Sequence, residues 1–528
     1  NAPAFEDLFL NTLNEKLTPK SQVTFMLDGN RVTLDNVSPQ TRLIDYLHRP
    51  DVAKAGTKLV CGQGGCGACT VMLTSYDPGQ NKVVNKAINA CLRPLAGLDG
   101  TMVTTTQGIG SVKSGLDEVQ YKLAANNGSQ CGYCSPGFTM NMYTLRQNNQ
   151  QLSQQQIVDN FDGNICRCTG YRPILEAFKQ FADDYEPPAD APEIKIDPDF
   201  DPSSVKPFTR IFPPSDYIDY MMQPQPLLIS ADGYTYERPV SLEALYKTKA
   251  LNGPIGESFR LLSGNTSIGI YETQPIYAET ALNPNYLVDV SAIAELQQVD
   301  IGSNGMVLGG GITLTRMLDV LTQAIKQLDT EKTAGLIALR EHLQVVANLQ
   351  VRNEATLAGN VFIGTNLGFL SDVVLMLATL GATVTVTSPK GTQTHDILTL
   401  PKENELPPGA IYHSFNIPYS QPDTYFDSYK IRRRNEDCHA LVNAGFMVQF
   451  DDNNTVNNCR IIYNGIKANY QLESTKYGIQ FEPVTANKTC DFLLGKCWNQ
   501  DTLHEALACL AQEMAVYEPP SGEAGQYE

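Results

Sequence analysis

The spacing of apolar and polar residues predicts a small mixed sheet at the start of the chain. Apolar residues alternate over 23–34 and are interrupted by a polar Asp-Gly-Asn turn, which indicates a two-stranded hairpin. A short amphipathic helix is expected over 41–48, where three apolar residues share one face. Further β-prone runs, which would complete the sheet, lie at 71–73, from Val83 onward and at 102–106.

The pattern becomes helical over residues 113–183. Pro136 suits the first turn of one helix, and Ser153 with Gln156 forms the signature of a capping box at the start of a second. A third helix is expected to open at Arg172. These helices are expected to end near Leu145, Phe161 and Tyr185. Residues 186–226 are rich in Pro, Asp and Ser and lack periodicity, which predicts an extended linker.

Short β-prone runs alternate with helical patterns from residue 227 to about 420, and a second mixed unit follows. Strands are expected at 261–262, 286–290, 306–308 and 382–387, with helices at 314–328 and 371–380. In the second unit, strands are expected near 444–450 and 460–463 and a helix near 502–515. We therefore divide the chain into six parts. They are an N-terminal arm (1–22), a mixed domain (23–108), a helical domain (109–185), a linker (186–226), a second mixed domain (227–420) and a C-terminal mixed subdomain (421–528).

Charge and composition narrow the classes of partner. The 528 residues carry 39 Lys and Arg against 57 Asp and Glu, a net charge of −18. Nucleic acid and anionic membranes would repel such a chain and are not expected as partners. The sequence has no run of 18 apolar residues, so no membrane span is expected. The chain begins without Met, which indicates a processed start or missing residues, and its scattered reduced cysteines favour a cytoplasmic location.

Eight cysteines in the first third of the chain form its most specific pattern. The first set, Cys61, Cys66, Cys69 and Cys91, has the C-x4-C-x2-C…C spacing of a plant-type [2Fe–2S] site. Glycines fill most of the positions between the first three. They permit the tight turns that converging thiolates require, and they let backbone N–H groups point at sulfur.

The second set pairs a C-x2-C with a C-x1-C motif. Cys131, Cys134, Cys166 and Cys168 fall at expected helix starts and inter-helix loops, where positive helix N-termini favour an anionic cluster. Disulfides and zinc are the alternatives for both sets. A disulfide framework suits small secreted domains, and a zinc ribbon does not call for a glycine-rich C-x4-C-x2-C loop. Iron–sulfur ligation is therefore favoured.

Two polar glycine segments are candidates for a dinucleotide site. The turn 263–267 and the segment 358–360 are each expected at a strand end, where small residues and backbone N–H groups could approach a pyrophosphate. Neither is specific alone, and no G-x-G-x-x-G follows a strand. The run 432–434 of three arginines could receive an anionic acceptor such as a nicotinamide dinucleotide, although Glu436 and Asp437 could cancel its charge.

Together these motifs resemble the xanthine dehydrogenase/aldehyde oxidase family of molybdenum hydroxylases. The likeness covers nearly the whole chain after residue 22 and is carried by the segments 61–71, 130–137, 163–174, 264–269 and 358–360. It implies an α+β multidomain fold. The expected parts are a β-grasp plant-type [2Fe–2S] domain, a helical-bundle [2Fe–2S] domain, an α+β FAD-binding domain and a C-terminal α+β subdomain.

The resemblance also implies cofactors and site residues. Two [2Fe–2S] clusters and FAD are expected on this chain. Molybdopterin with molybdenum is expected on a partner domain or subunit, so no catalytic residue is assigned to this stretch. Gln130 is expected to contact the pterin. FAD contacts are expected at Leu261, Leu262, Ser263, Gly264, Asn265, Thr266, Ser267, Ile268, Gly359, Asn360, Asp372 and Lys430.

The implied activity is that of an oxidoreductase of the xanthine dehydrogenase/oxidase type. Electrons would pass from molybdopterin through the two clusters to FAD, and then to NAD or dioxygen, in a dimer of complete units. Purine oxidation is favoured. One alternative is an aldehyde oxidase-like enzyme, and another is an electron-transfer module that donates to a different protein. A fold that has lost its centres is disfavoured because all eight cysteine ligands are present.

Several residues depart from the family pattern. Gln63 stands where glutamate is usual. Val345 and Val346 replace an aromatic pair that packs by the flavin in xanthine dehydrogenases, and the segment from Asn360 to Asp372 is about three residues longer than the common form. The Gln63 change should matter little, whereas the other two changes lie near the expected flavin and leave the electron acceptor open. The end at 522–528 is expected to be a cleavage point or limit within a longer polypeptide, unless the molybdenum centre is on a separate subunit.

Overall fold

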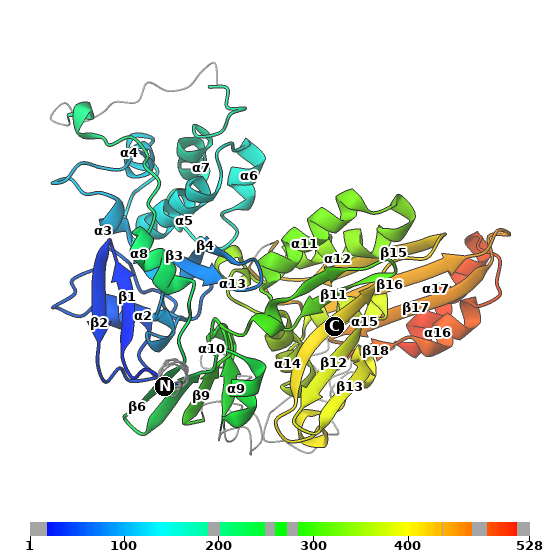
Figure 1. Cartoon of the computed structure of the whole chain (residues 1–528). Coiled ribbons are helices and arrows are strands. Elements are labelled where there is room, and N and C mark those ends of the chain that lie inside the picture. The colour runs from blue at the N-terminus through cyan, green and yellow to red at the C-terminus, as the bar shows by residue number, and fades with distance from the viewer. Residues whose placement is uncertain are drawn as a thin grey trace, which may run out of the picture.

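The computed structural model describes residues 18–187, 201–248, 259–271, 284–435, 437–466 and 483–514. Most of the expected N-terminal arm, part of the expected linker, Glu436 and the end of the chain lie outside the described residues. In Figure 1 the blue and cyan segments, which carry the eight cysteines, lie on one side of the molecule. The yellow to red segments of the C-terminal third lie on the other.

The first domain is a five-stranded sheet in the order β2-β1-β5-β3-β4, covered by a short helix. Its elements are β1 (Val23–Leu27), β2 (Asn30–Leu34), α2 (Leu43–Leu47), β3 (Thr70–Asp77), β4 (Lys82–Asn89), η1 (Ala96–Leu98) and β5 (Met102–Thr104). β1 and β2 form the expected hairpin, and β5 runs parallel to β1. Phe25, Leu43 and Val71 are fully buried between sheet and helix. This is the expected β-grasp arrangement, with the first cysteine loop leading into β3.

The second domain is helical. Its elements are α3 (Thr106–Ile109), α4 (Glu118–Ala125), α5 (Ser135–Asn148), α6 (Gln154–Asp159) and α7 (Arg172–Lys179). Ser153 and Gln156 form the expected capping box of α6. Met72 of β3 packs with Phe138 of α5, so the two cysteine-bearing domains share a core. The third helix ends earlier than expected, because beyond Lys179 the backbone makes turn bonds such as Phe181 N–H to Phe178 C=O.

The linker is less extended than its prolines indicated. η2 (Pro202–Ser204) and α8 (Ser215–Met221) form within it. Tyr217 of α8 is 2% exposed, and its hydroxyl donates to the Thr101 carbonyl at 2.9 Å. α8 therefore covers Met26 and Met102 of the first sheet. The expectation of an unbroken extended linker was wrong, because prolines that precede a helix do not interrupt it.

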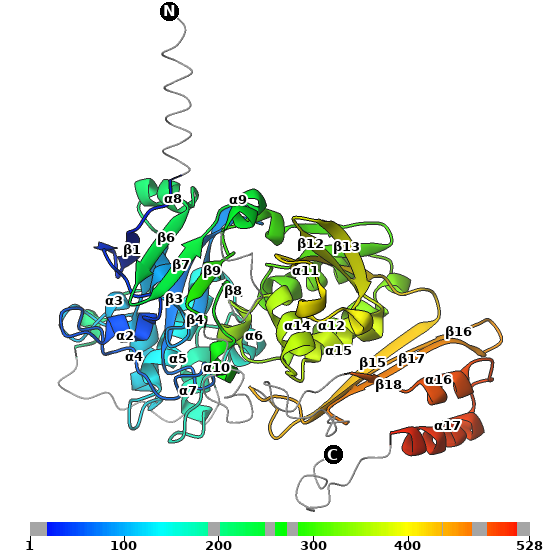
Figure 2. The ribbon, with the colours of Figure 1, turned by 90° about the horizontal axis from the view of Figure 1, so that it is seen from below.

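The second mixed domain begins with a four-stranded sheet in the order β6-β7-β9-β8. Its elements are β6 (Leu227–Ala231), β7 (Tyr234–Arg238), α9 (Leu242–Lys247), β8 (Arg260–Leu262), α10 (Ile268–Tyr271) and β9 (Tyr286–Asp289). Leu227, Ile229 and Tyr236 pack into the core of the first domain. Figure 2 shows the green strands β6, β7, β9 and β8 side by side in this order, with β8 on the side of the later helices such as α14.

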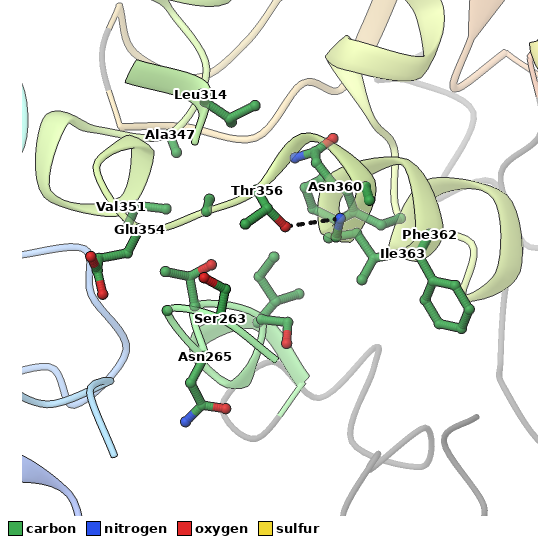
Figure 3. Close-up of a pocket in the computed structure, with 18 of the residues that line it drawn as sticks. Ser263, Asn265, Leu314, Ala347, Val351, Glu354, Thr356, Asn360, Phe362 and Ile363 are labelled. Atoms are coloured by element: carbon green, nitrogen blue, oxygen red, sulfur yellow. Dashed lines mark hydrogen bonds between the residues drawn. The ribbon is translucent and has the colours of Figure 1, made fainter. Parts of the chain in front are cut away.

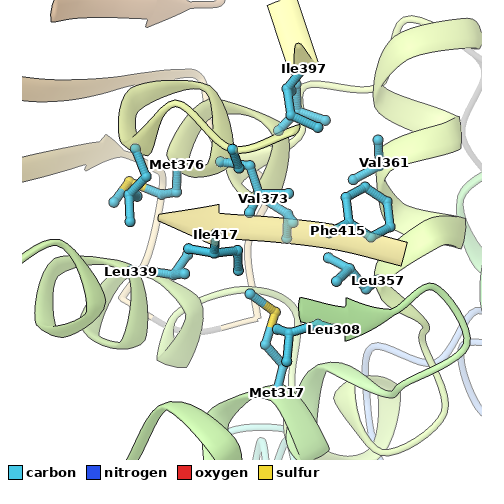
Figure 4. Packing of buried hydrophobic residues seen from close by; sticks show 14 of the residues in the cluster. Leu308, Met317, Leu339, Leu357, Val361, Val373, Met376, Ile397, Phe415 and Ile417 are labelled. Atoms are coloured by element: carbon cyan, nitrogen blue, oxygen red, sulfur yellow. The ribbon is translucent and has the colours of Figure 1, made fainter. Parts of the chain in front are cut away.

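A five-stranded sheet in the order β10-β11-β14-β12-β13 and a layer of helices complete this domain. The elements are η5 (Ala294–Gln297), β10 (Val299–Ile301), β11 (Gly305–Gly309), α11 (Leu314–Gln327), η6 (Thr330–Lys332), α12 (Ala334–Gln344), α13 (Leu349–Arg352), α14 (Leu357–Asn366), α15 (Asp372–Leu380), β12 (Thr383–Ser388), β13 (Gly391–Asp396), η7 (Ile397–Thr399), η8 (Glu403–Glu405) and β14 (Ile411–Pro418). Phe415 and Ile417 of β14 lie between Leu308 and the buried face of α15 around Val373 (Figure 4).

The C-terminal subdomain is an antiparallel sheet in the order β15-β16-β17-β18 between two helical layers. Its elements are β15 (Thr424–Ile431), β16 (Val442–Phe450), β17 (Val456–Asn464), β18 (Val484–Thr485), α16 (Asn487–Leu493) and α17 (Gln500–Glu513). Neighbouring residues of β17 face opposite layers. Ile462 joins the core around α15, and Ile461 joins the core around α16 and α17.

Candidate functional site

A cavity of about 400 Å³ lies where the second mixed domain meets the first cysteine loop. Figure 3 shows the turn after β8, with Ser263 and Asn265, facing the start of α14, with Thr356 and Asn360. Gln63, Gly64 and Gly65 of the first cysteine loop line the same cavity. A ligand held here would therefore lie close to the first cysteine set.

The cavity gathers nearly all of the residues expected to contact FAD. Those lining it are Leu261, Leu262, Ser263, Gly264, Asn265, Thr266, Ser267, Gly359, Asn360, Asp372 and Lys430. Ile268 does not line it and is 4% exposed in the core beneath the turn. Gln130 lies elsewhere, exposed beside Cys131. The positions fit one site, and their contact with FAD remains a prediction.

The turn after β8 is held open by contacts on its outer side. Asn265 adopts a left-handed conformation with φ of 61°. Its side-chain amide donates to the Leu92 carbonyl at 3.0 Å and accepts from Arg260 Nη2 at 2.7 Å. A Cβ on Gly264 would overlap Glu354, so only glycine fits this close approach. The turn is thereby anchored to the first domain, while its inner side faces the cavity.

The second glycine segment is not a turn at a strand end, as the sequence indicated, but the first turn of α14. Thr356 is the N-cap residue, and its hydroxyl oxygen accepts from Gly359 N–H at 3.1 Å (dashed in Figure 3). Asn360 Oδ1 accepts from the Ser371 hydroxyl at 2.6 Å. The first N–H groups of α14 are already paired: Leu357 N–H donates to the Ile312 carbonyl at 3.0 Å and Ala358 N–H to the Gly310 carbonyl at 2.9 Å. What this end of the helix still offers an anionic ligand group is the positive end of its dipole.

Asp372 and Lys430 form a buried ion pair at the cavity wall. Lys430 Nζ lies 2.8 Å from Asp372 Oδ2, while His342 Nε2 lies 3.0 Å and Asn443 Nδ2 2.8 Å from Asp372 Oδ1. Burial raises the pKa of Asp372, but the hydrogen bonds and charges of His342 and Lys430 outweigh burial and hold it below its usual value. The carboxylate is therefore ionised and fixed in orientation.

The first cysteine set converges in pairs. The pKa of the Cys61 thiol is lowered by a hydrogen bond with Cys66 and next by one with Cys91, and that of Cys69 is lowered by a hydrogen bond with Cys91. Gln63 N–H donates to Cys61 Sγ at 3.5 Å. Gly62, Gly64 and Gly67 have φ between 67° and 82°, as the turns of this loop require. Four adjacent sulfurs and an inward N–H group fit a [2Fe–2S] cluster.

In the second cysteine set, each cysteine of the C-x2-C motif is paired with a cysteine of the C-x1-C motif. Cys131 shares a hydrogen bond with Cys168. Burial raises the pKa of Cys134 to about 12, and a hydrogen bond with Cys166 adds to this. Cys166 Sγ accepts from Thr169 N–H at 3.4 Å. No three His, Cys, Asp or Glu side chains group around a single ion in the described part of the chain, but a binuclear cluster needs only two thiolates per iron.

The two sets differ in exposure. Cys69 and Cys91 are buried, and their loop faces the cavity. Cys131 and Cys168 are exposed, and Tyr133, which lies between Cys131 and Cys134, is 52% exposed. The second set therefore lies at a surface that another domain could cover.

Short helix α13 joins the cavity to both cysteine-bearing domains. Gln350 donates to Thr70 Oγ1 at 3.3 Å and to Asn164 Oδ1 at 3.0 Å. Arg352 Nη2 lies 2.6 Å from Asp162 Oδ2. All three contacts are long-range, so nothing in the local sequence of α13 pointed to them.

Several cavity residues were not assigned from sequence. They are Gln63, Ala347, Glu354, Thr356, Tyr412, Asp437 and His439, among others, whereas Val346 was expected near the flavin. Of the three arginines at 432–434, only Arg434 reaches the cavity, and it donates to the Asp437 carbonyl at 2.6 Å. Thr356 could have been found from its N-cap position before the glycine segment. Tyr412 lies in β14, and most of the others come from loops that are brought together only by the tertiary fold.

Four family models match successive parts of the chain. They are the "2Fe-2S iron-sulfur cluster binding domain" at 25–95, the "[2Fe-2S] binding domain" at 105–179, the "FAD binding domain in molybdopterin dehydrogenase" at 232–420 and the "CO dehydrogenase flavoprotein C-terminal domain" at 427–525. These matches give two [2Fe–2S] domains and an FAD-binding domain in the expected order.

Curated relatives match over almost the whole chain. Aldehyde oxidase 1 of Cavia porcellus is 32% identical, covering 96% of this chain and 38% of the relative. Xanthine dehydrogenase/oxidase of Gallus gallus is 31% identical, covering 96% and 39%. The chain thus spans about two fifths of the length of these relatives. Among solved structures, CO dehydrogenase from Oligotropha carboxidovorans is 21% identical, covering 55% of this chain and 91% of that one, with a TM-score of 0.43.

Among the described helices, none has the length and apolar character needed to cross a membrane. The domain order and the identity to full-length relatives agree with the cysteine motifs and the cavity. The chain therefore belongs to the xanthine dehydrogenase/aldehyde oxidase family, in which it corresponds to the iron–sulfur and FAD-binding portion.

Proposed function

We propose that this chain is the electron-transfer portion of a molybdenum hydroxylase. It would take electrons from a molybdopterin centre on a further domain or a separate subunit and deliver them to NAD or dioxygen. The observation that carries this proposal is the shared cavity, which is lined both by the expected FAD contacts and by Gln63, Gly64 and Gly65. When bound, the clusters would carry single electrons, and FAD would collect them for a two-electron acceptor.

The residues of the chain have distinct roles in this proposal. The turn 263–267 offers N–H groups to the pyrophosphate of FAD, and the N-terminus of α14 offers the positive end of its dipole. Asp372 and Lys430, fixed by their 2.8 Å contact, offer an acceptor and a donor to its polar edge. The sulfurs of Cys61, Cys66, Cys69 and Cys91 hold the cluster next to this cavity, and those of Cys131, Cys134, Cys166 and Cys168 hold the other.

The exposed face around Cys131 and Cys168 is the proposed contact for the molybdopterin domain. Gln130 is exposed there and would contact the pterin. The proposal retains the domain limits at 23, 109, 186, 227 and 421, a dimer of complete units, and the cytoplasm as the compartment in which the thiolate ligands stay reduced.

For the substrate we propose a purine, with an aldehyde as the alternative. The relatives at 31–32% identity include both xanthine dehydrogenase and aldehyde oxidases. Substrate is selected on the molybdenum domain in this proposal, so the choice is tested with the complete protein. Oxidation of hypoxanthine but not of an aromatic aldehyde supports the purine assignment, and the reverse result replaces it.

The acceptor is tested on this chain by stopped-flow spectroscopy. The chain is reduced with dithionite under anaerobic conditions and mixed with NAD⁺ or with dioxygen, and the return of flavin and iron–sulfur absorption is followed. Rapid re-oxidation by either compound supports the proposal and names the acceptor. Failure with both contradicts it and favours the alternative in which the chain donates electrons to another protein.

A further inference from the structure

We propose that Asn348 is a positioning residue that couples the first cysteine loop to the flavin cavity through a hydrogen-bonded bridge from Gly64 to Asp437. The inference rests on the proposed function, because it concerns the environment of the cluster and FAD. It assigns a role to Asn348 and Asp437, which neither the cysteine motifs nor the flavin turns include, and to the carbonyl of Gly64 inside the first cysteine motif.

Asn348 uses its whole side-chain amide in this bridge. Its Nδ2 donates to the Gly64 carbonyl at 2.9 Å and to Asp437 Oδ1 at 2.9 Å, and its Oδ1 accepts from Val351 N–H at 3.0 Å as the N-cap of α13. The side chain is fully buried. A saturated buried amide has one favourable orientation, since any rotation would leave polar atoms without partners.

The bridge touches the cysteine loop just before Cys66. Asn348 and Asn89, at 3.2 Å, both donate to the Gly64 carbonyl. Asp437 Oδ2 lies beside Gly65, 3.5 Å from where a Cβ would be. Gly64, Gly65 and Asp437 also line the cavity. Asn348 therefore connects the peptide that encloses the first sulfurs to a carboxylate on the cavity wall.

The surrounding packing leaves this bridge little freedom. A Cβ on Gly163, in the loop before Cys166, would lie 2.9 Å from the Asn348 Cβ. Ala347, the next residue toward the cavity, has φ of 51°. A non-glycine residue in this conformation is maintained only when its surroundings fix it. The bonds of Asn348 supply that constraint.

The physical effect on the cluster follows from the direction of the bonds. Donation to the Gly64 carbonyl polarises the Gly64–Gly65 peptide and increases the positive charge on the Gly65 N–H group. Positive dipoles near an iron–sulfur cluster favour its reduced, more negative state. Loss of the Asn348 donor should therefore make the first cluster harder to reduce. Loss of the Asn348 donor also removes the hydrogen bond that holds Asp437. The packing between the first cysteine loop and the flavin cavity, across which electrons would pass, then becomes less rigid.

Asn353 provides a matched control. It lies close to Asn348 in the sequence, is 6% exposed, and donates from Nδ2 to the Ala87 carbonyl at 2.8 Å. Its Oδ1 accepts from Thr315 at 2.7 Å. Asn353 therefore joins the same two domains through the same chemistry, but it contacts β4 and not the cysteine loop.

The test compares Asn348→Ser with Asn353→Ser in the cofactor-loaded chain. Serine still caps α13 but is too short to reach Gly64. The readouts are the midpoint potential and EPR signal of each cluster, and the rate of electron transfer to the flavin after rapid reduction. We expect N348S to shift one cluster to a more negative potential, leave the other unchanged and slow transfer to the flavin several-fold. N353S should leave both potentials unchanged.

Two results overturn the inference. If N348S and N353S have the same cluster potentials, the bridge does not act on the cluster, although the proposed function stands as long as the wild-type chain shows both clusters and FAD. If the wild-type chain lacks these centres, both proposals fail. Should N348S not retain cofactors, Asp437→Asn decides, because it keeps an acceptor for Asn348 and removes the charge. A more positive potential of the same cluster supports the inference, and no change overturns it.

Discussion

Arg93 Nη1 lies 2.6 Å from Glu354 Oε2, and this contact joins the first domain to the wall of the flavin cavity across 261 positions of sequence. Both side chains are 8% exposed. Arg93 also donates to the Ser263 carbonyl in the turn after β8. The pair therefore fixes the turn, the cavity wall and the first domain relative to one another.

Removing the charge of Glu354 should be strongly destabilising. Glu354→Gln removes the carboxylate that contacts the buried Arg93 guanidinium and leaves Asp289 as the nearby negative charge. Breaking a buried ion pair by removing one partner typically costs about 3–5 kcal/mol. The measurement is the midpoint of thermal unfolding with FAD present. Glu243→Gln, which breaks an ion pair that is more than 70% exposed, is the control and should lower the midpoint far less. Equal midpoints for the two variants would contradict this role of the Arg93–Glu354 pair.

His342 should lower the pH at which the chain releases FAD. The bonds from His342 and Lys430 hold the pKa of Asp372 below its usual value, against the effect of burial. The stabilisation by ionised Asp372 is therefore present above about pH 4, the value for an unperturbed Asp, and is lost as the pH falls through the lower folded pKa. In His342→Leu the pKa of Asp372 rises, so FAD release should begin at a higher pH.

Flavin fluorescence on titration from pH 7 down to about pH 2 measures this release, because the loss in the wild-type chain lies below about pH 4. The wild-type chain should retain FAD further into the acid range than His342→Leu. His395→Leu, on the exposed strand β13, should behave as wild type. Identical release curves for the wild type and His342→Leu would show that His342 does not hold Asp372 ionised.

The ionised carboxylate of Asp117 should lower the free energy of unfolding at neutral pH. It caps α4 by accepting from Val119 N–H at 2.8 Å, it is 4% exposed, and burial raises its pKa to about 6. A raised carboxyl pKa costs stability in full above pH 6, and the cost fades between pH 6 and about pH 4. Asp117→Asn keeps the cap and should stabilise by about 1–3 kcal/mol at pH 8.

The gain from Asp117→Asn should be smaller at pH 5 than at pH 8, measured as the difference in thermal midpoint from wild type at each pH. An equal gain at both pH values would mean that the ionised carboxylate is not the source of the cost.

Ala347→Gly should stabilise the chain. Ala347 lines the cavity in a left-handed conformation with φ of 51°. Glycine adopts this conformation without steric cost, and relief of the strain should exceed the added chain entropy by about 1 kcal/mol. Ala338→Gly in the middle of α12 is the control, since glycine inside a helix destabilises by about 1 kcal/mol. If Ala347→Gly unfolds at a lower temperature than the wild type, the backbone of Ala347 is not strained in the way we infer.

The parts of the site that follow from local chemistry could be predicted from the sequence. The cysteine spacings give the two ligand sets, and Ser153 with Gln156 gives the start of α6. Thr356 was overlooked, although its N-cap position before the glycine segment was a local signal that would have shown α14 to be a helix and not a turn.

The remaining parts depend on tertiary contacts that leave no local pattern. Tyr217 holds α8 against the first sheet through its hydrogen bond to the Thr101 carbonyl. The sequence around Tyr217 does not show that this side chain is buried. Asn348 and Gly64 are separated by 284 positions. Their contact depends on how three domains pack. Part of the cavity lining comes from loops that meet only when the domains pack. The sequence therefore predicted the ligand of the cavity more completely than the set of residues that line it.

The central claim is that this chain carries two different [2Fe–2S] clusters and one FAD, and the most direct measurement combines metal and flavin analysis with EPR of the reduced protein. We predict iron and acid-labile sulfide for two binuclear clusters and two distinct EPR signals. Cys91→Ala should remove only one of them, and Cys168→Ala only the other. A colourless protein that contains zinc, or variants that keep both EPR signals unchanged, would contradict the account.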